Sequence, residues 1–155
     1  NEDGIFVRWG FNSRLDNLQA AFLNFRLKHI EEDIRRRRLI AEKYHEGLKG
    51  IEEVKLPPGP DEHIDHYDVY QNYEIEALSR DSLREYLGEQ GIATIIQWGG
   101  NPVHSFSGLG FENVDFSHLI NTNNFFNNCL MLPMNMSVSD SDIDYIVENI
   151  NKFYS

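Results

Sequence analysis

The sequence predicts a small α/β layer of the α+β kind, in which a long N-terminal helix precedes a small antiparallel sheet packed by helices. Three observations predict it. Apolar residues recur at helical spacing from residue 13 to 50, two strand-like runs flank a short helical run, and an amphipathic segment closes the chain. This order is typical of antiparallel strands covered by helices. We therefore expect a helical segment, residues 1–50, and a small α+β domain, residues 51–155.

The first helix is expected to run from Ser13 to about Gly50. Ser13 is a good N-cap, and Asp16 follows at the spacing of a capping box. A helix of about ten turns is long for a globular protein, so we expect either a break or a partner surface. Its apolar residues recur three and four positions apart: Leu15, Leu18, Phe22, Phe25, Ile30, Ile34, Ala41, Tyr44 and Leu48.

Four consecutive arginines, Arg35 to Arg38, lie within this helix. They are compatible with an anion-binding patch. On a helix, however, they fan around the axis, with Glu31, Glu32, Asp33 and Glu42 within reach. We expect a solvated face with ion pairs.

The segment after Gly50 begins with a Pro/Gly-rich connection, "KLPPGPDEH". The run from Tyr67 to Glu76 then alternates apolar and polar residues, as a half-buried strand does. Ser79 is expected to cap a helix that Gly91 ends. A second strand, "IATIIQW", stops at "GGNP", and "VHSFSGLGF" follows as a loop.

The C-terminal part is predicted to hold two helices around a short strand. Residues 116–128 read as helical, and "CLMLPMN" as extended. Ser139 and Asp142 form a capping box for the last helix, with Val138 and Ile143 at staple spacing. One side of this helix is apolar: Ile143, Ile146, Val147, Ile150 and Phe153.

Composition and charge limit the classes of function. The chain has 155 residues, 41% of them hydrophobic, and a formal net charge of −11. This charge argues against nucleic acid and anionic membranes as partners. The single cysteine excludes an internal disulfide framework and fits a reducing, cytoplasmic location. No apolar run is long enough to span a bilayer, and the absence of an initial methionine suggests a trimmed chain or a fragment.

The mouth of the first helix is the first candidate site. Asn12 and Arg14 lie there beside Gly10. A helix start presents free backbone N–H groups that suit phosphate or carboxylate, and an arginine adds a planar charged fork. The alternative is that Ser13 caps, Asn12 forms a turn and Arg14 lies on the surface.

The other polar motifs form no complete catalytic constellation. His63 and His66 lie in a loop and at a strand start, and further convergent ligands are lacking, so we expect no metal site. Cys129 falls in an apolar run that reads as core. His104, after Pro102 in a glycine-bounded loop, is a candidate ligand-binding residue, although local evidence alone favours a structural hydrogen bond.

Together these segments resemble one family. The stretches "GFNSRLDNLQAAF", "RRRRLIAEKYHEGL", "HYDVYQNYEIE", "RDSLREYLGEQGIATIIQW", "PVH" and "LPMNMSVSDSDIDYIVENI" occur in this order. The chain resembles the C-terminal third to half of the DegT/DnrJ/EryC1/StrS family, the pyridoxal-phosphate (PLP)-dependent nucleotide-sugar aminotransferases. The resemblance implies fold type I, with residues 1–50 as an inter-domain and dimer-interface helix segment and residues 51–155 as the small C-terminal domain.

The resemblance also implies roles for individual residues. Asn12 matches the asparagine that contacts the PLP phosphate of the other subunit, which makes it a cofactor-binding candidate. Arg14 matches the motif arginine, and His104 matches a proline-x-histidine loop near the nucleotide-sugar. Family members often have a histidine-tyrosine pair where this chain has Gln97 and Trp98. Arg14, Trp98 and His104 are therefore the substrate-binding candidates, with Trp98 as a stacking surface or a buried aromatic.

The catalytic lysine of the family has no counterpart here, so we expect no catalytic residue in this chain and no activity from it alone. The resemblance implies that the intact parent, a homodimer with an N-terminal PLP-binding domain, transfers an amino group from an amino acid such as glutamate to a keto-sugar nucleotide. The product would enter surface polysaccharide or glycoside synthesis. Two alternatives stay open: a sugar dehydratase of the same family that uses PLP or its amine form, and a non-catalytic helical dimerisation module.

Overall fold

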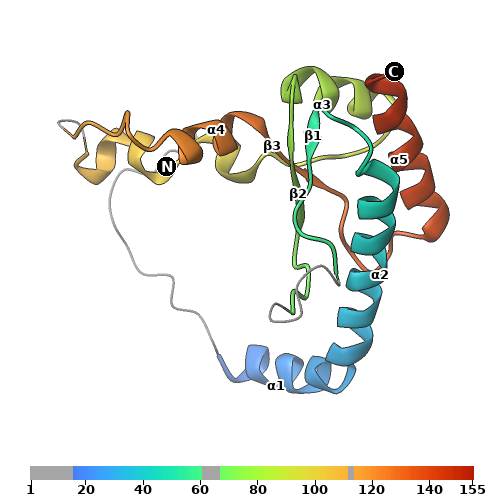
Figure 1. The fold of residues 1–155 in the computed structure, drawn as a ribbon. Helices are drawn as coiled ribbons and strands as arrows, with labels where there is room; N and C mark the ends of the chain where they lie inside the picture. Colours follow the sequence, from blue (N-terminus) through green and yellow to red (C-terminus); the bar gives the residue numbers. More distant parts are fainter. Residues whose placement is uncertain (1–15, 61–66, 112–113) are drawn as a thin grey trace.

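The computed structural model of the chain describes residues 16–60, 67–111 and 114–155 (Figure 1). The five α-helices of this part are α1 (Asn17–Arg26), α2 (Ile30–Leu48), α3 (Arg80–Glu89), α4 (Ile120–Asn128) and α5 (Asp140–Phe153). The three strands are β1 (Val54–Lys55), β2 (Tyr73–Ala77) and β3 (Cys129–Leu132). Short 3-10 turns are η1 (Leu27–His29), η2 (Gln97–Gly100), η3 (Val103–Ser105) and η4 (Ser107–Leu109).

The strands form one sheet in the order β1-β2-β3. Its antiparallel pairing was predicted from the sequence, whereas the strand order was not. Tyr73 pairs with Leu132 and Ile75 with Leu130, so these apolar side chains share one face of the sheet. Helices α2 and α5 lie side by side against the sheet (Figure 1). The fold is therefore a helix–sheet layer with its core between the two.

The core draws on both the helical segment and the small domain. Its fully buried residues include Ile40, Ala41, Tyr44 and Leu48 of α2, Leu83 and Leu87 of α3, and Ile143 and Ile150 of α5. Burial raises the pKa of Tyr44, whose hydroxyl donates to the Pro133 carbonyl at 2.9 Å. The second half of α2 is thus an integral part of the core.

Helices α2 and α5 approach closely at Gly47. A Cβ placed on Gly47 would lie 2.5 Å from Cγ1 of Val147, which is closer than carbon atoms pack. The Asn151 amide donates to the Gly47 carbonyl at 3.0 Å across the same contact. Glycine at this position therefore sets the distance between the two helices.

The predicted break in the N-terminal helix is confirmed, at the η1 turn between α1 and α2. Below this turn α1 runs off to one side of α2 (Figure 1). The predicted N-cap, Ser13, is wrong, because Asp16 caps α1. The Gln19 amide donates to Oδ1 of Asp16 at 2.8 Å, and the Asp16 amide donates to the Gln19 side chain at 3.3 Å. Aspartate is as good a cap as serine, and Gln19 completes its box.

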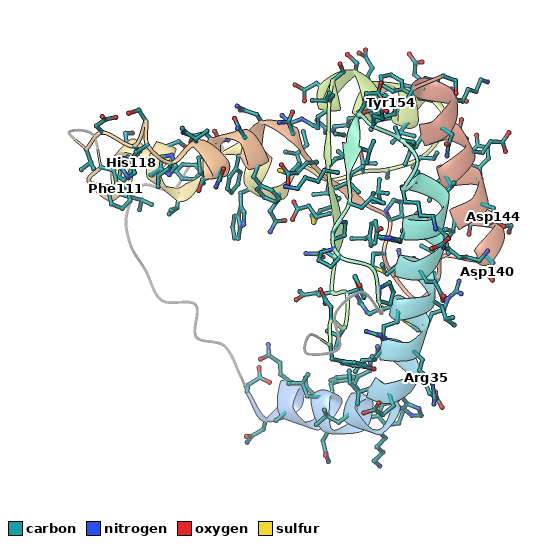
Figure 2. All side chains as sticks on the ribbon, in the orientation of Figure 1. Arg35, Phe111, His118, Asp140, Asp144 and Tyr154 are labelled. Atoms are coloured by element: carbon teal, nitrogen blue, oxygen red, sulfur yellow. The ribbon has the colours of Figure 1, made fainter. Side chains whose placement is uncertain are left out.

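The ion-paired face expected around Arg35 to Arg38 is confirmed only in part: Arg36 pairs with Asp140 at 2.6 Å. Three of the four guanidinium groups donate to backbone carbonyls of other segments, while Arg35 is exposed on α2 (Figure 2). The acceptors of Arg36, Arg37 and Arg38 are the carbonyls of Val138, Tyr70, Gln71, Asp68 and Pro60. Loop carbonyls outside a sheet or helix need donors, and long arginine side chains supply them.

The first predicted strand is shorter than expected. It begins at Tyr73 and not at Tyr67, because Tyr70 adopts a left-handed conformation with φ 49°. The Tyr70 amide donates to the Asp68 carboxylate at 2.7 Å, which is an Asx turn. This turn reverses the alternation, so Tyr70 is buried and Tyr67 is exposed.

The predicted strand "IATIIQW" is wrong. Only Ile95 pairs with the sheet, through a two-bond bridge to Met131 with N–O distances of 3.2 and 2.8 Å. The backbone turns left-handed at Trp98 directly afterwards, which ends the pairing.

The remaining helices agree with the sequence in position and differ in detail. The left-handed Gly91, φ 77°, follows the end of α3 as expected. Ser79 precedes α3, but its side chain makes no capping hydrogen bond and its φ is 56°. The capping box of α5 is confirmed: the Asp142 amide donates to Oγ of Ser139 at 3.2 Å. The predicted helix at 116–128 begins later, at Ile120.

Residues 97–111 and 114–128, called the arm below, run out from the sheet and return to it (Figure 1). The arm leaves after the Ile95–Met131 bridge, passes through η2, η3 and η4, and returns through α4 into β3. Most of its described side chains are exposed or half-buried. Within the described part of the chain, no helix has the length and apolar content needed to cross a membrane.

Candidate functional site

The arm begins with a left-handed turn that carries Trp98. Trp98 has φ 51° and ψ 27°, Gly99 has φ 64° and ψ 22°, and Gly100 has φ 76°. Glycine adopts this conformation freely, whereas a bulky side chain in it costs roughly 1–3 kcal/mol. The Trp98 side chain is 60% exposed. The predicted stacking residue is therefore presented to solvent from a constrained turn.

His104 lies further along the arm in η3 and is held by two neighbours. Its Nε2 lies 3.2 Å from Oδ1 of Asn123 on α4, and its ring centroid lies 4.7 Å from that of Phe116. The structural hydrogen bond anticipated as the alternative for His104 is thus present. It uses one ring nitrogen, and Nδ1 makes no hydrogen bond with the described residues.

An aromatic cluster forms the outer end of the arm. Phe116 packs edge-on against Phe111, with ring centroids 5.6 Å apart, and lies 6.5 Å from the ring of His118. Phe111 and His118 lie together at this end (Figure 2). The cluster and the Asn123 contact hold the returning and outgoing segments of the arm together around His104.

One carboxyl group, on Glu74, and one thiol group, on Cys129, lie in the sheet where the arm returns to it. Burial raises the pKa of the Glu74 carboxyl, and burial followed by the nearby Glu74 charge raises the pKa of the Cys129 thiol. Cys129 is fully buried, as the sequence analysis expected of a core residue. A thiol with a raised pKa is a poor nucleophile, so Cys129 is not a catalytic candidate.

The remaining predicted residues lie elsewhere. Asn12 and Arg14, and the pair His63 and His66, fall outside the described residues. Among residues 16–60, 67–111 and 114–155, no group of three His, Cys, Asp or Glu side chains is arranged to hold a metal ion. The arm carries both predicted substrate-binding residues, Trp98 in η2 and His104 in η3.

An open groove of about 700 Å³ lies away from the arm, at the edge of the sheet beside α5. Its wall is mostly apolar and includes Ile92, Ile95, Met131 and Met134. None of the predicted site residues lines it.

Sequence reasoning missed two residues that matter for the site. Asn123 and Phe116 fix the ring of His104, but each lies in a stretch of asparagines and phenylalanines whose spacing gives no pairing partner. Only a signal linking residue 104 to residues 116 and 123 would have identified them.

Comparison with known proteins places the whole chain in one group. A sequence model of the DegT/DnrJ/EryC1/StrS aminotransferase family matches residues 2–151. The chain is 35% identical over 150 residues to the "pleiotropic regulatory protein" of Geobacillus stearothermophilus, covering 94% of this chain and 38% of that protein. It is 31% identical over 146 residues to the dTDP-3-amino-3,6-dideoxy-alpha-D-galactopyranose transaminase of Aneurinibacillus thermoaerophilus, covering 93% and 38% of the two chains.

Solved structures agree with the sequence comparison. The crystal structure of S. venezuelae DesV in complex with a ketimine intermediate superimposes with a TM-score of 0.83 at 28% identity, covering 94% of this chain and 38% of DesV. An aminotransferase from Brucella abortus superimposes with a TM-score of 0.73 at 30% identity over 94% of this chain. The chain therefore spans about 38% of the length of these relatives. It belongs to the DegT/DnrJ/EryC1/StrS aminotransferase family.

Proposed function

We propose that this chain is the C-terminal portion of a PLP-dependent sugar aminotransferase. The observation that carries the proposal is the match of residues 2–151 to the family, together with the superposition on DesV over 94% of the chain. Two relatives are named as transaminases of dTDP-linked amino sugars. The intact parent transfers an amino group from an amino acid, glutamate in our proposal, to a keto-sugar nucleotide.

The described residues support the view that the catalytic lysine lies outside this chain. All five lysines of the sequence are described. Lys43 pairs with Asp144 at 2.9 Å, Lys49 with Glu46 and Lys55 with Glu76, each at 2.5 Å. The other two, on η1 and α5, are exposed. A lysine that bonds a cofactor needs a buried site and a free amine, whereas three of these five are ion-paired and the other two are exposed.

The cofactor contact that this chain supplies is proposed for Asn12, which lies outside the described residues. PLP, when bound in the parent, supplies the electron sink for amino transfer. The role of Asn12 is to donate a hydrogen bond to the cofactor phosphate of the partner subunit.

The arm is the proposed substrate-binding element of this chain. Trp98 offers an exposed aromatic face suited to stacking on a base or a sugar ring. His104 offers Nδ1, while its Nε2 bond to Asn123 fixes the ring. Arg14 is proposed to meet the anionic part of the nucleotide-sugar. These roles concern binding and orientation and involve no proton transfer.

Helix α1 is proposed to contact either the N-terminal portion of the parent enzyme or the partner subunit. Leu18, Phe22 and Phe25 are 69%, 65% and 60% exposed and recur at helical spacing, so they share one side of α1. An apolar stripe of this kind marks an interaction surface. We therefore propose that residues 1–50 contain an interface segment and that residues 51–155 form a domain that faces the substrate.

The test is amino transfer by the intact parent. We expect the parent to convert a dTDP- or UDP-linked keto-sugar to the amino sugar with glutamate as donor, detected by mass spectrometry of the nucleotide-sugar with ¹⁵N-labelled glutamate. The reading frame upstream of residue 1 should continue and encode the catalytic lysine. A histidine in place of that lysine, with loss of water from the sugar and no ¹⁵N incorporation, would favour the dehydratase alternative. A frame that does not continue upstream would favour the dimerisation module.

A further inference from the structure

The base of the arm is organised around one side chain, that of Arg80. Arg80 is the first residue of α3, and only 11% of its side chain is exposed. Its Nη1 donates to the carbonyls of Phe126 and Cys129 at 3.3 and 3.1 Å. These carbonyls lie where α4 ends and β3 begins. Arg80 therefore binds the returning end of the arm, and its charge lies where a helix C-terminus favours a cation.

The outgoing end of the arm lies against the same guanidinium. A Cβ placed on Gly100 would lie 3.5 Å from the Phe126 carbonyl oxygen and 3.7 Å from Nη2 of Arg80. Gly100 is the third residue of the left-handed turn that presents Trp98. The two ends of the arm thus meet at Arg80, and the residue that follows the Trp98–Gly99 pair packs against it.

The ionic partner of Arg80 does not account for this placement. Nε donates to the carboxylate of Asp81 at 2.7 Å, but the Asp81 side chain is 80% exposed and is the next residue in the chain. Such a surface pair contributes little. The guanidinium reaches three places with three nitrogens: Nε faces Asp81, Nη1 faces the two carbonyls, and Nη2 lies toward Gly100. The single nitrogen of a lysine cannot occupy all three positions.

We infer that Arg80 is a positioning residue for substrate binding, which acts by holding the left-handed Trp98–Gly100 turn and so the indole of Trp98. The inference rests on the proposed function, in which Trp98 contacts the nucleotide-sugar. A tryptophan in the left-handed region persists only where its surroundings over-determine the backbone. Arg80 supplies that constraint by fixing the Phe126 carbonyl, which lies against Gly100, and by packing on Gly100 itself.

The first experiment needs no activity and uses the 155-residue chain. Trp9→Phe leaves Trp98 as its one tryptophan, since the sequence has two. In this background we expect Arg80→Lys and Arg80→Ala to lower the fluorescence anisotropy of Trp98 and increase its quenching by acrylamide, with unchanged far-UV circular dichroism. The control is Arg84→Ala, an exposed arginine one turn further along α3, which should change neither signal. If the fluorescence anisotropy of Trp98 is the same in the Trp9→Phe chain with and without Arg80→Lys, the inference is overturned.

The second experiment uses the intact parent enzyme and separates positioning from folding. We expect Arg80→Lys to raise the KM for the nucleotide-sugar about tenfold, the size of one lost well-placed contact. The rate of the half-reaction with the amino donor alone should stay unchanged, because that donor does not need Trp98. In a Trp98→Ala background, Arg80→Lys should have no further effect on KM. A full tenfold effect in that background would show that Arg80 acts by another route and would overturn the inference.

The two experiments fail in different ways. If the parent transfers no amino group, the proposed function is wrong, whereas the fluorescence result still reports whether Arg80 holds the turn. If the parent is active and Trp98→Ala leaves the KM for the nucleotide-sugar unchanged, Trp98 is not a contact residue, and the inference about Arg80 is wrong while the activity stands.

Discussion

Self-association of the isolated chain through α1 is the prediction that the structure quantifies best. Burying a Phe or Leu side chain fully contributes about 1.5–3 kcal/mol. Because Leu18, Phe22 and Phe25 are 60–69% exposed, each has about 1–2 kcal/mol still to gain, where we scale the full-burial figure by the exposed fraction. In a symmetric dimer both copies lose the contact, so Phe22→Ser should cost about 2–4 kcal/mol. This corresponds to a dissociation constant about 30- to 700-fold weaker.

Sedimentation velocity over a concentration series measures this effect. Serine and phenylalanine have similar helix propensities, so the substitution tests the contact and not the helix. The matched control is Asn24→Ser, which lies about 160° around α1 from Phe22 at 100° per residue and is also exposed. It should leave the dissociation constant unchanged. A compact monomer at high concentration, or equal effects of the two substitutions, would refute the role of the stripe.

The remaining predictions concern the cofactor, the caps and one carboxyl. The isolated chain should not bind PLP covalently; an absorption band near the visible edge that survives dialysis and is removed by borohydride would contradict this. In the intact parent, Asn12→Ala should weaken PLP retention by about 1–3 kcal/mol, and mixing it with protomers that lack the catalytic lysine should restore activity, as equilibrium dialysis and mixed-dimer assays would show. Ser139→Ala should lower the free energy of unfolding by about 1 kcal/mol because a cap is lost, whereas Ser79→Gly should raise it in the same urea titration because φ is 56° and the side chain caps nothing. Burial raises the pKa of the Glu74 carboxyl in the folded state above its ordinary 4.5, so the charged carboxylate destabilises the fold increasingly as pH rises from that value through the folded pKa. Glu74→Gln should therefore raise the free energy of unfolding more at pH 7 than at pH 4. Glu76→Gln, the control, loses the ion pair with Lys55 and should not raise it.

The parts of the fold that the sequence predicted are those in which local patterning and packing agree. The apolar side of α5 and its Ser139 box coincide, so both position and burial were predictable. The length of the N-terminal helix predicted either a break or a partner surface, and the break is present at η1. In each of these cases, neighbours within a few residues in sequence decide the outcome.

The parts that the sequence did not predict depend on distant neighbours or on backbone geometry. The arginines of α2 pair with loop carbonyls 22 to 102 residues away, and no periodicity identifies those acceptors. Left-handed conformations at Tyr70, Ser79 and Trp98 shortened a strand, removed a cap and ended a strand, and none of these residue types predicts a positive φ. The candidate site was the least predictable part, because the position of the His104 ring depends on Asn123 and Phe116, which lie in a separate segment.

The way the arm is attached to the sheet has an evolutionary consequence. The Ile95–Met131 bridge and the Arg80 contacts hold the two ends of the arm together. These contacts at its base compensate the entropic cost of closing the loop, and contacts along the arm are not needed for this. Doubling the length of such a loop costs only about 0.6 kcal/mol. Changes of length among residues 101–111 and 114–119, which precede α4, should therefore alter the free energy of unfolding of the core little. A scaffold with this property can acquire new recognition surfaces while its folding is conserved.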